Sequence, residues 1–315
     1  MKLITESFRE SKSLKFILMG VFFGLVVLMT IGTFFDYQIA HAVAAEPQGF
    51  LFWSFGVSFE VLGFLPAILV NISLFAILSV YLKRKGWKIF FHVMTVFGLV
   101  GAVYCSIFWT LSNHGVDLRS VIVWPICTTI GIILSFPVIM LFKRIKDETI
   151  QKKLIYLLII GVAMGTFANM IPGLLQVFWG RYRFFDVADY GLPYLPWYQP
   201  IGRVSGIGAS TASFSSLHAS SVFSMIILMM VGWKLGLKKK TQIILASISI
   251  AMLVCVPLSR MVLRWHYLTD VVFSLITSLV VLIIVTIVLD AIFGKRLKNF
   301  IGQDITEEQT TENIN

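Results

Sequence analysis

The chain has 315 residues, of which 57% are hydrophobic and only 13% are charged, and it carries a formal net charge of +10. Soluble domains contain about 25% charged residues, so this composition excludes an ordinary soluble protein and predicts a polytopic membrane protein. Cys105, Cys127 and Cys255 all lie in apolar segments, and with no Cys/His metal spacing around them they indicate buried thiols rather than a disulfide framework or a metal site.

Apolar segments recur along the chain, and a segment of about 20 such residues can cross a bilayer of about 30 Å. The first one follows a basic N-terminus, but it is longer than the roughly 7–15-residue core of a signal peptide, so we expect a retained helix. The hydropathy predicts an all-α transmembrane helical bundle of about eight spans, at residues 14–35, 58–82, 88–110, 119–142, 154–178, 215–233, 241–258 and 267–293. Glu60, near the start of the second span, is either a functional intramembrane acid or a residue of the outer interface.

The basic residues predict the orientation of the bundle. If the N-terminus is inside, five inner segments hold 20 of the 26 Lys and Arg residues, including all sixteen lysines. The positive-inside rule expects this asymmetry, and inner lysines would contact anionic headgroups of the bilayer, so the positive net charge needs no nucleic acid. The six basic residues left outside are all arginines, whose planar fork suits phosphate or carboxylate. They are Arg119, Arg181, Arg183, Arg203, Arg260 and Arg264.

Polar residues gather in three segments that open on the outer side in this topology: 176–186 (QVFWGRYRFFD), 213–221 (SFSSLHASS) and 259–270 (SRMVLRWHYLTD). In the third segment, His266 and Asp270 are four residues apart, which places both on one face of a helix. A carboxylate bonded to one ring nitrogen fixes the tautomer and leaves the other nitrogen able to attack. His218, in the second segment, would be a second imidazole that can protonate a leaving group.

The same segments offer groups that bind an anion. Ser215 or Ser216 can cap the helix predicted to begin there, and the free backbone N–H groups of that helix favour a negative charge. Arg183 and Arg260 would neutralise the oxygens of a transferring phosphoryl group. These residues therefore predict phosphoryl transfer at the outer surface of the membrane.

The three segments resemble, in order, the three motifs of the type 2 phosphatidic acid phosphatase (PAP2) superfamily. The third motif of that family is Ser-Arg, five residues, His, three residues, Asp, and Ser259, Arg260, His266 and Asp270 match it in full. The resemblance covers about residues 176–270 by motif and the last four helices by arrangement. It implies that His266 is the nucleophile that forms a phosphohistidine, that Asp270 orients it, and that His218 is the general acid.

The other two motifs match in part. The second, Pro-Ser-Gly-His, is matched by Ser216 and His218, with Ser215 and Leu217 at the Pro and Gly positions. The first, Lys, six residues, Arg-Pro, is matched by Arg183, with Gln176 at the Lys position and Phe184 at the Pro position. The resemblance implies a phosphate held by Arg183, Arg260, Ser216, Gln176, Ser259 and the backbone N–H of Leu217. It also implies that neither a metal ion nor another cofactor is needed.

Three departures from the family qualify these expectations. Gln176 removes a cation that Arg181 or Arg264 could replace, and Leu217 adds bulk where the glycine of the family lets the backbone approach phosphate. The family usually has six spans, so we place an extra helical pair at about residues 88–142. The expected parts of the chain are N-terminal transmembrane helices with the extra pair (1–153), a PAP2-like catalytic core (154–293) and a cytoplasmic polar tail (294–315).

The leading hypothesis is a metal-independent phosphatase of the cell membrane, with cytoplasmic termini and an extracytoplasmic site. Its substrate would be a lipid phosphate or diphosphate, of the undecaprenyl diphosphate, phosphatidylglycerophosphate or phosphatidic acid class. One alternative is a phosphotransferase that uses the same histidine, and another is a catalytically decayed protein that binds lipid phosphates. A transporter would show Gly/Pro breaks in repeated halves, which the sequence lacks, and no oligomeric state is predicted.

Overall fold

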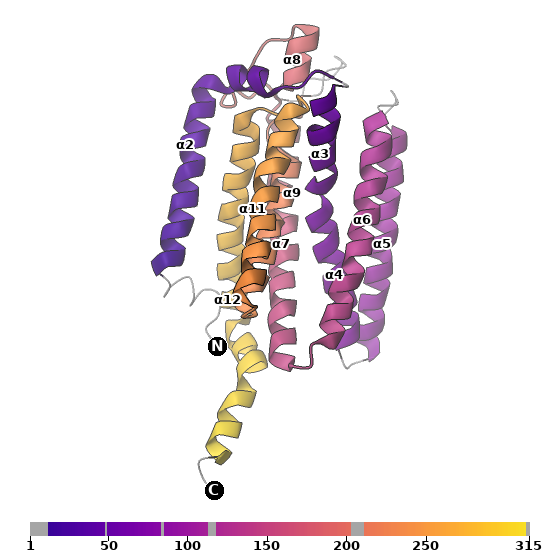
Figure 1. The fold of residues 1–315 in the computed structure, drawn as a ribbon, viewed down its shortest axis with the longest axis vertical. Coiled ribbons are helices and arrows are strands. Elements are labelled where there is room, and N and C mark those ends of the chain that lie inside the picture. Colours follow the sequence, from indigo (N-terminus) through magenta and orange to yellow (C-terminus); the bar gives the residue numbers. More distant parts are fainter. Residues whose placement is uncertain (1–11, 48, 83–84, 113–117, 203–210, 313–315) are drawn as a thin grey trace.

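The computed structural model describes residues 12–47, 49–82, 85–112, 118–202 and 211–312, and the side chains of 12–15, 17, 61, 101–124, 127, 141, 290 and 292–312 lie outside this description. Every named element in the described part is a helix (Figure 1), which confirms the predicted all-α class. The elements are α2 (Lys12–Val43), η1 (Phe52–Val57), α3 (Ser58–Gly63), α4 (Leu65–Tyr81), α5 (Lys85–Ser112), α6 (Leu118–Arg144), α7 (Glu148–Phe178), α8 (Phe184–Tyr190), α9 (Leu217–Val222), η2 (Phe223–Met225), α10 (Ile226–Lys234), α11 (Lys239–Val262) and α12 (Leu268–Glu312).

Six segments in the described part are long and apolar enough to cross a membrane: Leu18–Val43, Phe52–Tyr81, Glu148–Phe178, Leu217–Lys234, Lys239–Val262 and Leu268–Leu289. The predicted count of eight is therefore not confirmed. Helices α5 and α6 correspond to the predicted spans 88–110 and 119–142 but are not among the six. The side chain of Arg119 and the whole of Arg203, both predicted to lie outside, fall beyond the described part.

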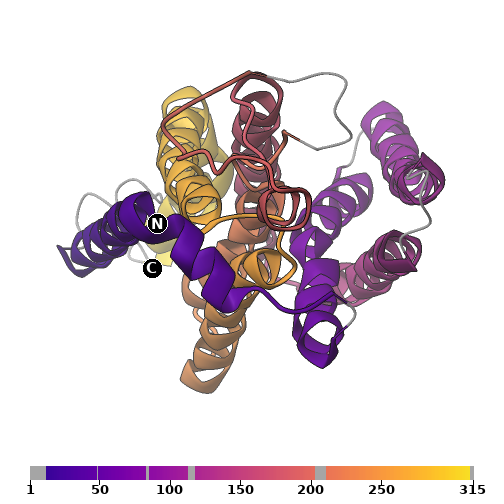
Figure 2. The same cartoon turned by 90° about the horizontal axis from the view of Figure 1, so that it is seen from above.

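The helices form a bundle in which α7 packs against α9, α10 and α12. Leu157, Ile160 and Met164 of α7 meet Leu279 and Leu282 of α12 in the largest buried apolar cluster. Helix α2 packs along α12 on one side, and the α5–α6 pair packs on α4 on the other (Figure 2). The α5–α6 pair lies at the edge of the bundle, which agrees with the expected extra helical pair at about residues 88–142. The predicted division of the chain into three parts stays a prediction.

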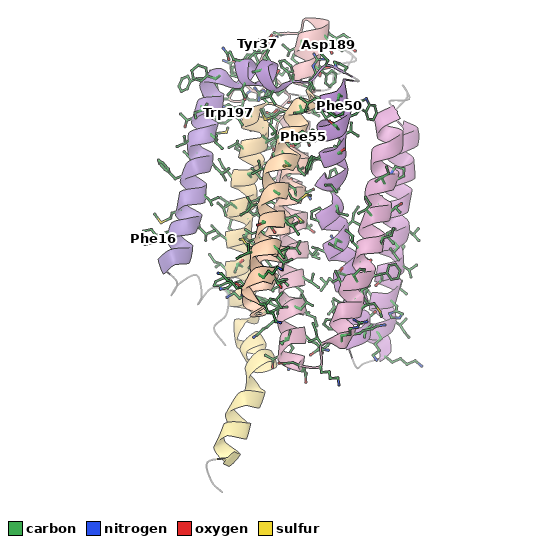
Figure 3. All side chains as sticks on the ribbon, in the orientation of Figure 1. Phe16, Tyr37, Phe50, Phe55, Asp189 and Trp197 are labelled. Atoms are coloured by element: carbon green, nitrogen blue, oxygen red, sulfur yellow. The ribbon has the colours of Figure 1, made fainter. Side chains whose placement is uncertain are left out.

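The surface of the helices is apolar, and aromatic and charged side chains mark its ends. Phe16 of α2 is 71% exposed and projects outward (Figure 3), as expected for a helix that faces lipid rather than water. Asp189 and Tyr37 lie at the end of the bundle that α8 covers (Figure 3). The start of α5 and the α6–α7 turn, which carry predicted inner lysines, lie at the opposite end (Figure 1). The polar segments 176–186, 213–221 and 259–270 therefore lie at the α8 end of the bundle, away from these residues.

Candidate active site

A tight turn brings Arg181 into the interior directly after α7. Gly180 has φ +66°, and a Cβ atom on it would lie 1.7 Å from the carbonyl oxygen of Gly202, so only glycine fits here. The backbone of Arg181 then pairs with the segment before α9: its N–H donates to the Thr211 carbonyl at 3.0 Å, and its carbonyl accepts from the Ser213 N–H at 3.1 Å. As a result the Arg181 side chain is only 1% exposed.

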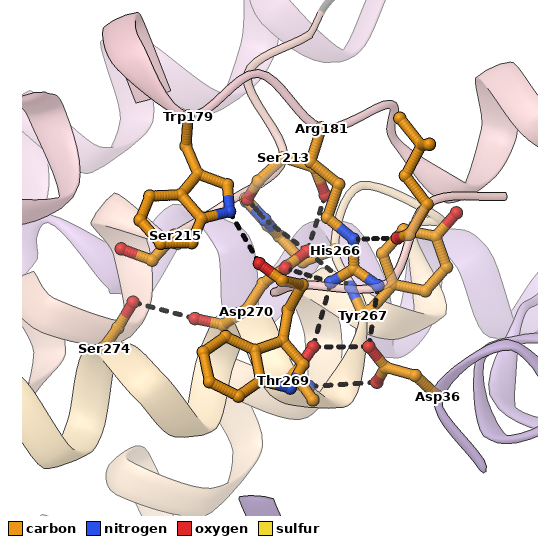
Figure 4. A network of polar contacts seen from close by, with 12 residues as sticks. Asp36, Trp179, Arg181, Ser213, Ser215, His266, Tyr267, Thr269, Asp270 and Ser274 are labelled. Atoms are coloured by element: carbon orange, nitrogen blue, oxygen red, sulfur yellow. Dashed lines mark hydrogen bonds and ion pairs between the residues drawn. The ribbon is translucent and has the colours of Figure 1, made fainter. Parts of the chain in front are cut away.

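The Arg181 guanidinium joins three parts of the chain (Figure 4). Nη1 donates to Asp270 Oδ1 at 2.5 Å and to Thr269 Oγ1 at 2.9 Å, and Nη2 donates to Asp36 Oδ2 at 2.8 Å. The remaining donors reach the Leu195 carbonyl at 2.8 Å and the Tyr194 hydroxyl at 3.5 Å. Burial alone would lower the pKa of Arg181, but the two carboxylates outweigh it and raise the pKa, so the group stays charged.

This geometry corrects the expectation that Arg181 replaces the missing cation of the first motif. All of its N–H groups are used by protein acceptors, so none is left for a phosphate. Arg264, the other candidate, forms a bidentate ion pair with Asp189 of α8, at 2.5 and 3.1 Å. Both arginines therefore serve contacts within the protein.

The first turn of α12 is capped by two carboxylates. Asp270 Oδ2 accepts the Tyr267 backbone N–H at 2.9 Å, which is the reach of a capping-box residue back to the helix start. Asp36 Oδ1, from α2, accepts the Thr269 N–H at 3.0 Å, and Asp36 Oδ2 accepts a short hydrogen bond from the Thr269 hydroxyl. Negative charge at a helix N-terminus is favourable, so these contacts fix the start of α12, directly after His266.

His266 is buried, and its ring orientation is fixed by a backbone carbonyl. Nδ1 lies 2.7 Å from the Ser213 carbonyl oxygen and 3.7 Å from Asp270 Oδ2. A carbonyl can only accept, so Nδ1 carries the proton and Nε2 has the free lone pair. The predicted direct hydrogen bond from Asp270 is replaced by an indirect one, because Asp270 Oδ2 accepts from the Ser213 hydroxyl at 2.5 Å. Burial lowers the pKa of His266, which favours the neutral ring.

The two predicted phosphate-binding arginines both lie close to one indole ring, that of Trp265. The guanidinium carbon of Arg183 is 3.8 Å from the centre of the Trp265 ring, and that of Arg260 is 5.3 Å from it. Arg260 is buried and forms a short ion pair with Glu60 of α3. Glu60 is thus buried inside the protein and paired with an arginine. The structure therefore brings Arg183 and Arg260 together beside the loop that carries His266.

The second motif lies over the start of α12. The Ser216 N–H donates to the Asp270 carbonyl at 3.3 Å, and Ser216 Oγ caps α9 by accepting from Ala219 N–H at 3.4 Å. Leu217 is the first residue of α9, followed by His218. The Gln176 side chain donates to the Ser215 carbonyl at 2.7 Å. Gln176 therefore holds the segment that leads into α9.

Ser259 is the matched motif residue whose side chain turns to its own helix. Its hydroxyl is buried and donates to the Val256 carbonyl at 2.7 Å. Its position in the last turns of α11 precedes a helix end of the Schellman type, in which the Trp265 N–H reaches the Arg260 carbonyl at 3.1 Å and Arg264 has φ +66°. Ser259 thus supports the helix end, and its hydroxyl proton is not offered to a ligand.

Sequence reasoning missed the residues that support the predicted site from a distance. Asp36 lies one residue past the predicted end of the first span, Glu60 was left undecided, and Ser213 and Thr269 carry no motif signal. An isolated acid next to an apolar span was the available signal for both Asp36 and Glu60. In the part of the chain that the structure describes, no group of three His, Cys, Asp or Glu side chains is placed to hold a metal ion.

Comparison with known proteins assigns the segment that carries this site. Residues 152–293 match the family model described as the PAP2 superfamily. No curated protein and no solved structure gives a significant match to the chain. The matched segment contains His218, His266 and Asp270, whereas Asp36 and Glu60 lie outside it. The resemblance predicted from the motifs is confirmed over this segment, so the membrane-spanning chain carries a PAP2 superfamily domain at residues 152–293.

Proposed function

We propose that the chain is an integral membrane enzyme that releases phosphate from a lipid phosphate or diphosphate through a phosphohistidine on His266. The observation that carries this proposal is the 2.7 Å contact between His266 Nδ1 and the Ser213 carbonyl. It commits the ring to the tautomer with a nucleophilic Nε2, as covalent catalysis requires. The carboxylate of Asp270, 3.7 Å from Nδ1, would stabilise the positive charge that the ring acquires on attack.

The reaction would proceed in two displacements at phosphorus. His266 Nε2 attacks the phosphorus atom, and the bond to the leaving oxygen breaks as His218 gives it a proton. His218 then takes a proton from a water molecule, whose oxygen attacks phosphorus and breaks the P–N bond. Arg183 and Arg260, which both contact the Trp265 ring, would neutralise the charge on the non-bridging oxygens in both steps. No metal ion takes part in these steps.

The position of the site supports a lipid substrate and an extracytoplasmic orientation. The site is at the α8 end of apolar helices, where a phosphate headgroup would meet the arginines while its tail stays in the bilayer. The lysine-rich turns at the opposite end support cytoplasmic termini and an outward-facing site in the cell membrane. Undecaprenyl diphosphate, phosphatidylglycerophosphate and phosphatidic acid all satisfy these conditions.

The test is phosphate release by the purified protein from a panel of lipid phosphates and diphosphates, with His266→Ala as the control. Release by the native chain and not by the variant is the expected result. If substrate is consumed only when an alcohol is added, and no free phosphate is released, the result would favour the alternative of a phosphotransferase. Binding without any turnover would favour the alternative of a catalytically decayed protein that binds lipid phosphates. Gln176 supports this alternative, because its amide is a neutral group at the lysine position of the family motif.

A further inference from the structure

The short helix α3 lies outside the matched segment 152–293, yet it packs against both α9 and α11. These are the helices that carry His218 and Arg260. Glu60 and Gly63 are three residues apart, so they lie on the same face of α3. One face of α3 is therefore turned to two of the predicted functional residues.

Gly63 and the residue after it contact His218 closely. A Cβ atom added to Gly63 would lie 2.6 Å from His218 Cδ2, which is closer than atoms can approach without a shift. The ring of Phe64 packs edge-on against the His218 ring, with the ring centres 4.3 Å apart and the planes at 62°. The imidazole is thus confined by a glycine on one side and an aromatic ring on another, which restricts its rotation.

Glu60 holds Arg260 in a comparable way, one turn earlier. Both side chains are buried, with 7% and 3% of their surfaces exposed, and their short ion pair joins α3 to α11. Trp265 lies over the same guanidinium. A buried acid keeps its place in an apolar bundle only when it is paired, and here its partner is the arginine that the third motif assigns to phosphate.

We propose that α3 is part of the active site: Glu60 positions Arg260 for the phosphoryl oxygens, and Gly63 with Phe64 positions His218 for the leaving group. These three are positioning residues, since each acts through a group that would touch the substrate. The inference rests on the proposed function and extends the site beyond the matched segment. It predicts that changes in α3 alter particular steps of the reaction and not only the amount of folded protein.

The first test separates the His218 contact from general stability by changing the leaving group. In Gly63→Ala the ring of His218 must shift, so proton donation suffers, and general acid catalysis is worth about 10²–10⁴-fold. We expect turnover of phosphatidic acid to fall at least about tenfold more than turnover of 4-nitrophenyl phosphate, whose leaving group needs little protonation. Gly165→Ala, a buried helical glycine of α7 with no atom within 4 Å of the added Cβ, should leave the ratio unchanged.

An unchanged ratio in Gly63→Ala would overturn the His218 part of the proposal. If Gly63→Ala does not fold, Phe64→Leu gives the same comparison without the clash, because it removes the ring that packs on His218. Loss of folded protein lowers turnover of both substrates equally, so the ratio reports positioning alone.

The second test addresses Glu60 through anion binding. Glu60→Gln breaks the ion pair that positions Arg260, so orthovanadate, which mimics the transferring phosphoryl group, should bind at least about threefold more weakly, and turnover of phosphatidic acid should fall at least about tenfold. Glu148→Gln, at an exposed ion pair at the start of α7, is the matched control and should change neither value. Equal or tighter vanadate binding in Glu60→Gln would refute the role of Glu60.

The outcomes also separate this inference from the proposed function. If the native protein hydrolyses no phosphate ester, the proposed function is refuted. The role of Glu60 can still be tested in that case, because vanadate binding can be measured by thermal stabilisation of the protein. An active native protein whose Gly63→Ala and Glu60→Gln variants match their controls would leave the function standing and remove α3 from the site.

Discussion

The variant Arg181→Ala tests whether the Arg181 guanidinium stabilises the fold or binds phosphate. The substitution leaves Asp36 and Asp270 buried without the guanidinium that bonds to both, at 2.8 and 2.5 Å. Removing one partner of a buried pair costs about 3–5 kcal/mol. Since a factor of ten in an equilibrium corresponds to about 1.4 kcal/mol, the folded-to-unfolded ratio should fall by about 10²–10⁴. Arg264→Ala is the matched control, because its partner Asp189 is 44% exposed and such a pair is worth about 0–1 kcal/mol.

The assay is unfolding of the two purified variants in mixed micelles, followed by tryptophan fluorescence. We expect Arg181→Ala to unfold at a much lower denaturant fraction than Arg264→Ala, and we expect Gln176→Lys not to restore it, because Gln176 bonds to the Ser215 carbonyl and not to either carboxylate. Equal midpoints for the two alanine variants would refute the structural role. Rescue of activity by Gln176→Lys would reinstate Arg181 as a phosphate-binding residue.

The remaining predictions concern the chemistry and the topology. His266→Ala should lose at least about 10³-fold in turnover of a lipid phosphate, and a variant that retains turnover would remove the phosphohistidine from the mechanism. Because burial lowers the pKa of His266 and the neutral ring attacks, kcat/KM should hold as pH falls to about 6.5 and decline only below it; an acid limb centred above about pH 6.5 contradicts this assignment. Activity should persist in EDTA and be blocked by orthovanadate, so loss in EDTA that a divalent metal restores would argue for a metal-dependent reaction. A thiol at Tyr190→Cys, a position 72% exposed, should react with an impermeant maleimide in intact cells, and one at Lys239→Cys only after permeabilisation; the opposite pattern would invert the topology.

Hydropathy located the long helices well and their ends less well. The predicted span 241–258 lies within α11 (Lys239–Val262), and 154–178 lies within α7 (Glu148–Phe178). The first helix instead runs to Val43, eight residues past its predicted end, because Asp36 is stabilised inside the bundle by Arg181 and Thr269. A charge in a sequence indicates the end of a span only when the fold offers it no partner.

The site could be predicted where its residues share a motif and not where they come from separate helices. Fixed spacing pointed to His266, Asp270 and Arg260. The partners of these residues are far apart in sequence: Arg260 and Glu60 are separated by 200 residues, and Arg181 and Asp36 by 145. A single sequence holds no signal for such pairing. This is also why Arg181 was assigned to phosphate, since its distance from Arg183 was known and its contact with Asp36 was not.

The hydrogen bonds of Arg181 also set an order of events during biogenesis. Asp36 belongs to α2, Arg181 follows α7 and Asp270 belongs to α12, so the three residues are synthesised in this order. Until α12 is inserted, the helix start that adjoins His266 does not exist, and Asp36 has Arg181 as a partner but lacks Thr269. A chain without α12 therefore lacks the helix start beside the proposed nucleophile, so the proposed phosphoryl transfer requires that α12 be in place.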